Sequence, residues 1–394
     1  MNKVNKKSVV SGMRTTGSMH LGHYHGVLKN WLSLQKKHKC YFFAADLHAM
    51  TTYKNVSNSL KDNTTNMILE WLSAGIDPKN SCIFVQSCIP EHSELHLLLS
   101  MIVPVNWLTR IPSYKDKNNS FLKSYGFLGY PILQSSDILL YNPDYIPIGE
   151  DQISHIEITR KIARMFNSTF GKKINVGQSI QNNIKLLDKK NLNLFIQYIK
   201  NYKKKNCIRS LKLSKEVILR SIYKKKQDEM HNLSSKINVF KEPKILLGRY
   251  PKLMGADGKK MSKSYKNTIN LIESSGNLKK KIMKTPTDPY KIKVKDPGNP
   301  DNCSVWQFHI LYNNTLEKSI VKNNCTKGYI SCKDCKSILL KKMQEEHNPI
   351  REKYTLFKSD QEYVDNIIQS GNKEARAVAK KTLFKVKKAI NFLL

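Results

Sequence analysis

Two short motifs, far apart in the chain, carry residue types suited to binding a nucleotide. The first, His20-Leu21-Gly22-His23, holds two histidines three positions apart with a glycine between them. At the start of a helix this spacing turns both imidazoles to one face, and Gly22 lets a flat adenosine or a phosphate approach the backbone. Either histidine taken alone is explained equally well as a structural residue.

The second motif is the basic loop from Gly258 to Ser264, in which Lys260 and Lys263 flank small hydroxyl residues. A glycine-led loop of this kind can close over a triphosphate and neutralise the charge that builds on a leaving pyrophosphate. In a lysine-rich chain the alternative is a plain exposed turn. The occurrence of both motifs in one chain favours the nucleotide interpretation.

The sequence patterns of two large nucleotide-binding classes are missing from these segments. The turn before His20 has no GxGxxG pattern, and the segment from Gly255 to Lys260 lacks the spacing of a Walker loop. Dehydrogenases of the dinucleotide-binding type and P-loop NTPases are therefore disfavoured.

Strands and helices alternate through the first half of the chain and position the first motif. A β-branched run predicts a strand over 8–12, directly before the motif, and periodic apolar residues predict a helix over 21–37. Further strands are predicted at 40–45, 82–86 and 145–148, and further helices ending at Ala74 and covering 91–102, 131–141 and 151–166. This alternation predicts an α/β fold with a doubly wound parallel sheet of the Rossmann type, which binds ligands at the carboxyl ends of its strands.

Changes in composition divide the chain into four parts. Residues 1–170 form the first part of the predicted sheet-containing domain, and residues 171–244 are rich in lysine, asparagine and leucine, which predicts a basic helical insertion. The sheet-containing domain resumes over 245–285 with the basic loop. A cluster of prolines then marks the start of an all-helical C-terminal domain, 286–394.

The charge of the chain indicates the kind of partner. Its 394 residues include 67 basic and 31 acidic side chains, a formal net charge of +36, and such a field attracts polyanions, a nucleic acid first among them. No apolar run approaches the length of a membrane span, and the basic start is not followed by the apolar segment of a signal peptide. We therefore expect a soluble, cytoplasmic protein whose eight cysteines are reduced thiols or metal ligands.

The two motifs together resemble the signatures of the class I aminoacyl-tRNA synthetases, which match His20–His23 and Lys260–Ser264. Along nearly its whole length the chain is similar to the bacterial tryptophanyl-tRNA synthetases of that class. Further stretches that support the resemblance are Ser11–Arg14, Tyr130–Leu139, Gly149–Gln152 and Val305–Gln307. The resemblance implies a homodimeric ligase that activates L-tryptophan with ATP and Mg²⁺, releases pyrophosphate, and transfers tryptophan from the adenylate to the 3′-terminal adenosine of tRNA(Trp). It also implies that the C-terminal helices bind the anticodon.

The resemblance assigns roles to individual residues as well. Those implied in tryptophan binding are His48, Tyr130, Gln134, Asp137 and Gln152. Those implied in ATP binding are Arg14, Thr15, Thr16, Gly22, His23, Gly149, Glu150, Asp151, Leu253, Lys260, Met261, Ser262, Lys263 and Ser264. Those implied in catalysis are His20, His23, Lys117, Lys260 and Lys263, the lysines through contacts with the phosphates. The chain departs from the family pattern at Gln134, where some members have methionine, and at Thr15, which replaces a common proline.

Asp137 is a candidate binding residue on the basis of its sequence neighbours alone. It lies among Ile132, Leu133, Ile138 and Leu139 in a predicted apolar helix, where an unpaired carboxylate is costly. A helix cap or an internal partner would explain it structurally. In a tryptophan pocket the carboxylate offers the indole N–H a partner that phenylalanine cannot use, and a contact of this kind can discriminate by about 10⁴–10⁵.

Four of the cysteines, Cys303, Cys325, Cys332 and Cys335, lie close together in the sequence. Four neighbouring thiolates are what a four-thiolate metal site requires. Some bacterial tryptophanyl-tRNA synthetases resemble the chain here and hold a [4Fe–4S] cluster on cysteines of nearly this spacing, beside the anticodon-binding region. The resemblance therefore implies such a cluster, with zinc as the second choice and four unligated thiols as the alternative.

Three other functions compete with this interpretation: a tyrosyl-type synthetase, a tRNA-binding paralogue without activity, and a small-molecule nucleotidylyltransferase, which uses the same histidine motif. The intact basic loop and the helical C-terminal region favour an active synthetase, and the Asp137 segment favours tryptophan as its substrate. His92 and His96, four positions apart, lack the adjacent glutamate of a zinc protease motif and are predicted to be solvated helix residues.

Overall fold

The computed structural model describes residues 6–51, 59–115, 124–171, 189–205, 238–248, 253–259 and 261–392, with positions 187, 210, 213, 214, 216 and 217 between them. Its strands are β1 (Ser8–Arg14), β2 (Lys39–Ala45), β3 (Ser81–Val85), β4 (Tyr145–Ile148) and β5 (Lys244–Leu247), and they form one parallel sheet in the order β3-β2-β1-β4-β5. The chain order reverses at β1 and β4, so the crevice at their carboxyl ends is the expected binding position of a doubly wound sheet. The predicted fold class is confirmed.

Most of the described chain is helical. The helices of the sheet-containing part are α1 (Leu21–His23), α2 (Lys29–Leu34), α3 (Asp46–Met50), α4 (Ser59–Ala74), α5 (Glu91–Ser100), α6 (Val105–Thr109), α7 (Pro112–Lys115), α8 (Tyr125–Leu139) and α9 (Ile153–Phe170). Later in the chain come α11 (Lys189–Lys205), α13 (Ser275–Lys284), α14 (Ser304–Tyr312), α15 (Thr315–Thr326), α16 (Cys332–Ser359) and α17 (Gln361–Ile390).

The predicted elements are present with shifted bounds. The helix expected over 21–37 is interrupted, because residues Tyr24–Leu28 form a π-helical turn between α1 and α2. Helix α8 begins well before Pro131, because the Ser124 side chain caps it by accepting a hydrogen bond from the Phe127 N–H. Strand β5 had no sequence prediction, since its four residues lie at a sheet edge next to a basic segment.

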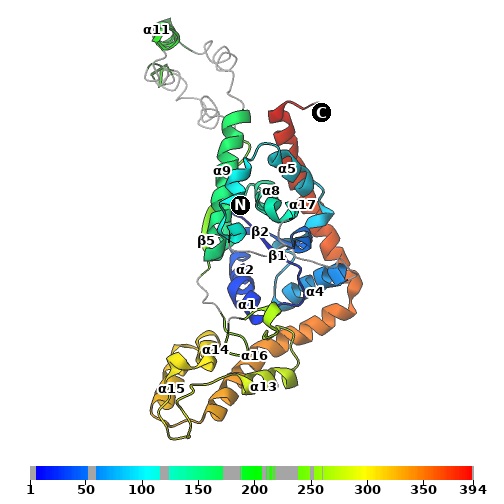
Figure 1. Ribbon diagram of the computed structural model, residues 1–394. Coiled ribbons are helices and arrows are strands. Elements are labelled where there is room, and N and C mark those ends of the chain that lie inside the picture. The colour runs from blue at the N-terminus through cyan, green and yellow to red at the C-terminus, as the bar shows by residue number, and fades with distance from the viewer. Residues whose placement is uncertain are drawn as a thin grey trace. The chain divides into compact units, whose positions relative to one another are not determined.

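The C-terminal helices share their apolar cores with the sheet. One core cluster joins Trp31, Phe42 and Trp71 to Ile350 of α16 and Val364 of α17. Helix α16 packs against α4 (Figure 1). Residues 1–160 and 242–383 accordingly form one compact unit, while residues 161–241 and 384–394 form a second.

Within the second unit, Asn167 organises the chain on either side of the basic segment. Its side-chain oxygen accepts hydrogen bonds from the Val239 and Phe240 N–H groups, and its amide donates to the Phe240 carbonyl. The lysine-rich helix α11 lies in the region predicted to be a helical insertion. In the parts of the chain described, no helix combines the length and apolar composition needed to cross a membrane.

Helix α17 covers the edge of β3, where backbone groups would otherwise be unpaired. The Asn372 side chain accepts a hydrogen bond from the Val85 N–H at 2.9 Å, and the Cys82 thiol donates to the Gly371 carbonyl at 3.3 Å. A Cβ atom at Gly371 would lie 1.8 Å from the Ile83 carbonyl oxygen. The close approach of α17 therefore depends on this glycine.

We expect Gly371→Ala to lower the free energy of unfolding by about 1–3 kcal/mol, because the added methyl group meets backbone that cannot move aside alone. Gly276→Ala is the matched control, since a Cβ there meets nothing within 4 Å. It should stay within about 1 kcal/mol of the unaltered protein. Chemical denaturation measures both, and equal stability of the two variants would contradict the proposed close packing.

Candidate functional site

The first motif lies directly after β1, at the start of α1. His20 is the N-cap residue of α1, where its Nδ1 accepts a hydrogen bond from the Gly22 N–H at 3.1 Å, and the His23 Nδ1 accepts one from the His20 N–H at 3.4 Å. The two rings stack with their centroids 3.9 Å apart. As predicted, both imidazoles lie on one face.

These contacts fix the protonation of both rings. Burial, with the positive charge of Lys263, lowers the pKa of His20 to about 4, and burial together with nearby positive charges lowers that of His23 to about 3. Both rings are therefore neutral near pH 7. Because each Nδ1 accepts a backbone N–H, the single proton of each ring lies on Nε2. The motif thus offers two neutral Nε2–H donors side by side.

The basic loop is held by a buried asparagine. The Asn267 side chain accepts a hydrogen bond from the Ser262 N–H and donates to Asp257, each at 2.8 Å. The Met261 N–H donates to the Leu253 carbonyl at 2.9 Å, and both of these side chains are buried. Gly258 has a φ of +78°, a conformation that favours glycine.

Backbone hydrogen bonds join the two motifs. The Leu21 N–H donates to the Ile269 carbonyl, and the Leu271 N–H donates to the Met19 carbonyl, each at 2.9 Å. Leu21 and Met261 lie in one apolar cluster, together with residues of α13, α14 and α16. Lys263 reaches the first motif directly, because its Nζ donates to the carbonyls of Thr16 at 3.1 Å and Gly17 at 2.8 Å.

A buried acid beneath the first motif was missed by the sequence analysis. Glu70 of α4 is 3% exposed and accepts a hydrogen bond from the Met19 N–H at 2.8 Å. Burial raises the pKa of Glu70 to about 8, against the opposing effects of that hydrogen bond and of Lys263. The available signal was a glutamate among apolar residues in Met67–Leu72.

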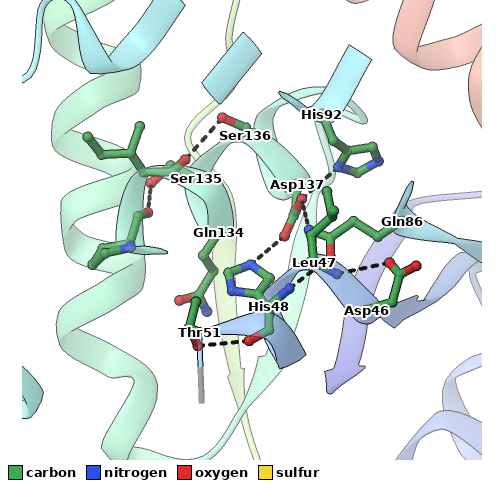
Figure 2. A network of polar contacts seen from close by, with 12 residues as sticks. Asp46, Leu47, His48, Thr51, Gln86, His92, Gln134, Ser135, Ser136 and Asp137 are labelled. Atoms are coloured by element: carbon green, nitrogen blue, oxygen red, sulfur yellow. Dashed lines mark hydrogen bonds and ion pairs between the residues drawn. The ribbon is translucent and has the colours of Figure 1, made fainter. Parts of the chain in front are cut away.

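The predicted amino acid site is centred on Asp137 of α8, which is 1% exposed. Its Oδ2 contacts His48 Nε2 of α3 at 2.9 Å. Its Oδ1 contacts His92 Nδ1 at 2.6 Å and Gln86 Nε2 at 2.8 Å. Figure 2 shows the carboxylate between the rings of His92 and His48. Burial opposes ionisation, but the hydrogen bonds from His48 and His92 lower the pKa of Asp137 below its ordinary value.

The prediction that His92 is solvated was wrong. It is fully buried, because α5 packs against α8 and turns this ring toward Asp137, and its Nε2 contacts the Tyr141 hydroxyl at 2.9 Å. His96, one turn further along, is half-buried, and burial lowers its pKa. Spacing along one helix cannot reveal a partner that a different helix provides.

The other predicted amino acid ligands surround this carboxylate. The Gln134 amide donates to the Gln152 side-chain oxygen at 3.5 Å, and the Tyr130 hydroxyl contacts the buried His155 at 3.1 Å. The rings of His48 and Tyr130 meet edge to face, with centroids 6.4 Å apart. The five residues predicted to bind tryptophan thus lie in one region.

The predicted ATP residues lie at or after the carboxyl ends of β1 and β4, apart from Leu253 and those of the basic loop. Arg14 is exposed, and its charge contributes to the low pKa of His23, while Thr15 is buried. Gly149, Glu150 and Asp151 follow β4 at the surface. Lys117 and Lys260 lie outside the described residues, as does the side chain of Ser264.

The four neighbouring cysteines come from three helices: Cys303 caps α14, Cys325 lies in α15, and Cys332 and Cys335 lie in the first turn of α16. All four thiols are free and half-buried. Burial and the other three cysteines raise the pKa of Cys335 to about 12. Within the described residues, no group of three or more His, Cys, Asp or Glu side chains has a geometry that would hold a metal ion.

Comparisons with known proteins identify the family to which the chain belongs. The family of class I tRNA synthetases (W and Y) matches residues 2–231 and 188–348. The chain is 37% identical over 390 residues to the tryptophan–tRNA ligase of Ralstonia nicotianae, covering 97% of this chain and 98% of that protein. It is 39% identical over 391 residues to the tryptophan–tRNA ligase of Thermotoga maritima, covering 98% and 99%. The crystal structure of tryptophanyl-tRNA synthetase from Campylobacter jejuni complexed with ADP and tryptophan has a TM-score of 0.74 at 27% identity, covering 98% of this chain and 100% of that chain.

We expect Glu70→Gln to change how stability depends on pH. The folded state keeps a proton on Glu70 up to a pKa of about 8, whereas the unfolded chain releases it near 4.5, so the unaltered protein loses stability as pH rises through this window. Glutamine still accepts the Met19 N–H but does not titrate. Between pH 5 and pH 8 the variant should therefore gain on the order of 1–3 kcal/mol relative to the unaltered protein. Thermal unfolding at several pH values measures this, with the exposed Glu362→Gln as control, and parallel profiles would contradict the assignment.

Proposed function

Because the chain belongs to the class I tRNA synthetases of the tryptophan and tyrosine group, we infer that it is an ATP-dependent tryptophan–tRNA ligase. It activates L-tryptophan to tryptophanyl-adenylate and then transfers tryptophan to the 3′-terminal adenosine of tRNA(Trp). Similarity to tryptophan–tRNA ligases over nearly the full chain supports this activity. The structural observation that carries the proposal is the buried Asp137 carboxylate. A wholly apolar side chain has no N–H or O–H group that could donate a hydrogen bond to it.

The alternative functions have less support. A tyrosyl-type enzyme shares the fold, but the relatives above are tryptophan ligases. An inactive paralogue would not need neutral His20 and His23 next to Lys263, an arrangement suited to phosphate chemistry. A small-molecule nucleotidylyltransferase would not need similarity to a ligase that extends through the C-terminal helices.

Activation needs no protein nucleophile. A carboxylate oxygen of tryptophan attacks the α-phosphorus of ATP, and the bond to the bridging oxygen of the β-phosphate breaks, so that pyrophosphate leaves with the bonding electron pair. Mg²⁺ enters with ATP as part of the substrate. The protein contributes orientation and charge stabilisation.

The residues of the two motifs are suited to this task. The Nε2–H groups of His20 and His23 are placed to donate to phosphate oxygens, and they add no charge that would hold the product. Lys263 is placed to exchange the carbonyls of Thr16 and Gly17 for oxygens of the leaving pyrophosphate. Lys117 and Lys260 are assigned the same kind of contact through the family resemblance.

We assign ATP binding to the carboxyl ends of β1 and β4 and to the basic loop. The residues concerned are Arg14, Thr15, Thr16, Gly22, His23, Gly149, Glu150, Asp151, Leu253, Lys260, Met261, Ser262, Lys263 and Ser264. Tryptophan binding is assigned to Asp137, with His48, Tyr130, Gln134 and Gln152 around it.

The partners follow from the same proposal. We propose that tRNA(Trp) binds with its anticodon against the helices of 286–394, and the net charge of +36 favours such a polyanion. We propose that the chain is divided by function into residues 1–170, 171–244, 245–285 and 286–394. We further propose that the enzyme acts as a homodimer in the cytoplasm.

Amino-acid-dependent exchange of pyrophosphate into ATP, measured with each of the twenty amino acids, tests the proposed function. Tryptophan should support rapid exchange, with phenylalanine and tyrosine lower by about 10⁴ or more in kcat/KM. Subsequent charging of tRNA(Trp) completes the test. A preference for tyrosine, or exchange with no amino acid at all, would overturn the assignment.

We expect Lys263→Ala to lower the rate of exchange by about 10²–10³, roughly 3–4 kcal/mol, because charge accumulates on pyrophosphate only as it leaves. The KM for ATP should change much less. Lys280→Ala, which removes a lysine from the exposed surface of α13, is the control and should leave both parameters unchanged. An effect confined to the KM for ATP would contradict a role in the transition state.

The [4Fe–4S] cluster stays a prediction. Its support is the set of four free thiols in Cys303, Cys325, Cys332 and Cys335, although they do not form a single-ion site. Burial and, after it, neighbouring cysteines of the set raise the pKa values of Cys325 and Cys335. Thiolates that bind different iron atoms of one cluster lie further apart than the ligands of a single ion. Such a cluster would serve structure or tRNA docking, since its ligands are far in the sequence from both motifs.

Anaerobic purification followed by iron, sulfide and zinc analysis decides whether the four thiols bind a cofactor. We expect iron and sulfide in proportion to one cluster per chain, and their loss in Cys332→Ser. Cys88→Ser, which removes an exposed thiol outside the set, should retain them. Zinc at one ion per chain would replace the cluster assignment, and absence of all three would mean that the thiols are unligated.

A further inference from the structure

The Asp137 carboxylate has a limited number of places for hydrogen bonds. A carboxylate accepts about four hydrogen bonds, two on each oxygen. Both places on Oδ1 are taken, by His92 and Gln86, and one on Oδ2 is taken by His48. A single place therefore remains, on Oδ2, for a donor of the substrate.

The contacts of His92 determine which oxygen of Asp137 keeps a free acceptor position. Its Nδ1 faces an oxygen that only accepts, so this nitrogen carries a proton and donates to Asp137 at 2.6 Å. Its Nε2 contacts the Tyr141 hydroxyl at 2.9 Å. Burial and the nearby Asp137 charge raise the pKa of Tyr141 well above its ordinary value, so this hydroxyl keeps its proton and is able to donate it to the ring.

The result is a buried relay from Tyr141 through His92 to Asp137. Packing keeps the ring in place, because His92 is fully buried beside Phe84 and Tyr141. Gln86 adds a second constraint. Its Oε1 accepts a hydrogen bond from the backbone N–H of His48 at 3.4 Å, while its Nε2 donates to Asp137. A carboxylate held in this way keeps its charge and its orientation before any ligand arrives.

We propose that His92 is a positioning residue for substrate selection, which acts through Asp137 and does not touch the substrate. By holding Oδ1 and the negative charge, it directs the free position on Oδ2 toward a substrate N–H donor. This inference rests on the proposed function, because it takes tryptophan to be the ligand of the pocket. Its distinctive consequence is that removing His92 reduces the preference for the indole N–H more than it reduces general binding.

Two substrates separate these effects. One is tryptophan, and the other is β-(benzothiophen-3-yl)alanine, in which sulfur replaces the indole N–H at nearly the same shape. The measured quantity is the ratio of their kcat/KM values in the pyrophosphate exchange assay. His92→Leu should lower this ratio at least about tenfold, mainly by slowing the reaction with tryptophan.

Two further variants should change the kcat/KM ratio by smaller amounts than His92→Leu. His92→Asn keeps an N–H donor near the position of Nδ1 and should restore a large part of the ratio. Tyr141→Phe removes only the hydroxyl that fixes the ring and should give a smaller loss than His92→Leu. Leu95→Ala, at a fully buried apolar position on the same helix, is the matched control for loss of packing. It should lower stability without changing the ratio.

The outcomes distinguish this inference from the proposed function. Equal losses with both substrates in His92→Leu, or the same change of ratio in Leu95→Ala, would make His92 a purely structural residue and overturn the inference alone. Absence of tryptophan-dependent exchange in the unaltered protein would overturn the proposed function and this inference with it. Thermal unfolding of each variant checks that the protein compared is folded.

Discussion

An ionised carboxylate can lie inside an apolar pocket only where the protein replaces the hydrogen bonds that water would supply. Asp137 meets this requirement with donors from three different elements: α3, the turn after β3, and α5. One carboxylate on α8 thus links these three elements by hydrogen bonds. We propose that this prior organisation around the charge reduces the rearrangement that binding of tryptophan requires.

Hydrogen bonds between distant parts of the chain also organise the histidine motif and the basic loop. They are far apart in the sequence, but backbone hydrogen bonds at Leu21 and Leu271 join them into one layer. Glu70 accepts a hydrogen bond from the Met19 N–H in this layer, and Lys263 of the basic loop donates one to the Gly17 carbonyl. Lysine and neutral histidines lie together here because burial keeps both imidazoles uncharged. The positive charge beside the two rings therefore comes from Lys263 and Arg14, and we propose that Lys263 contacts the phosphates of ATP.

The sequence allowed prediction of whatever depends on local patterns. Alternating apolar runs predicted the parallel sheet, and the histidine motif was correctly predicted to begin a helix directly after the first strand. The predictions failed where a property depends on contacts between elements. His92 was predicted to be solvated because its own helix gives no sign of Asp137, which α8 provides.

Other features were missed for related reasons. The π-helical turn at Tyr24–Leu28 has no distinctive local pattern, and β5 is a short edge strand whose order comes from pairing with β4. Glu70 was overlooked because a single acid in an apolar helix is a weak signal without its partner at Met19. The cysteine spacing indicated proximity, which the effect of the other three cysteines on the pKa of Cys335 supports, but spacing could not specify the geometry of the thiols.

The central claim is that Asp137 accepts the indole N–H of tryptophan. Tryptophan labelled with ¹⁵N at the indole nitrogen reports this contact directly in the NMR spectrum of the bound amino acid. The account predicts an indole proton resonance well downfield of that of free tryptophan and slow to exchange with water, with most of the shift lost in Asp137→Asn. A bound indole N–H with the chemical shift of free tryptophan, or with a shift unaffected by Asp137→Asn, would contradict it.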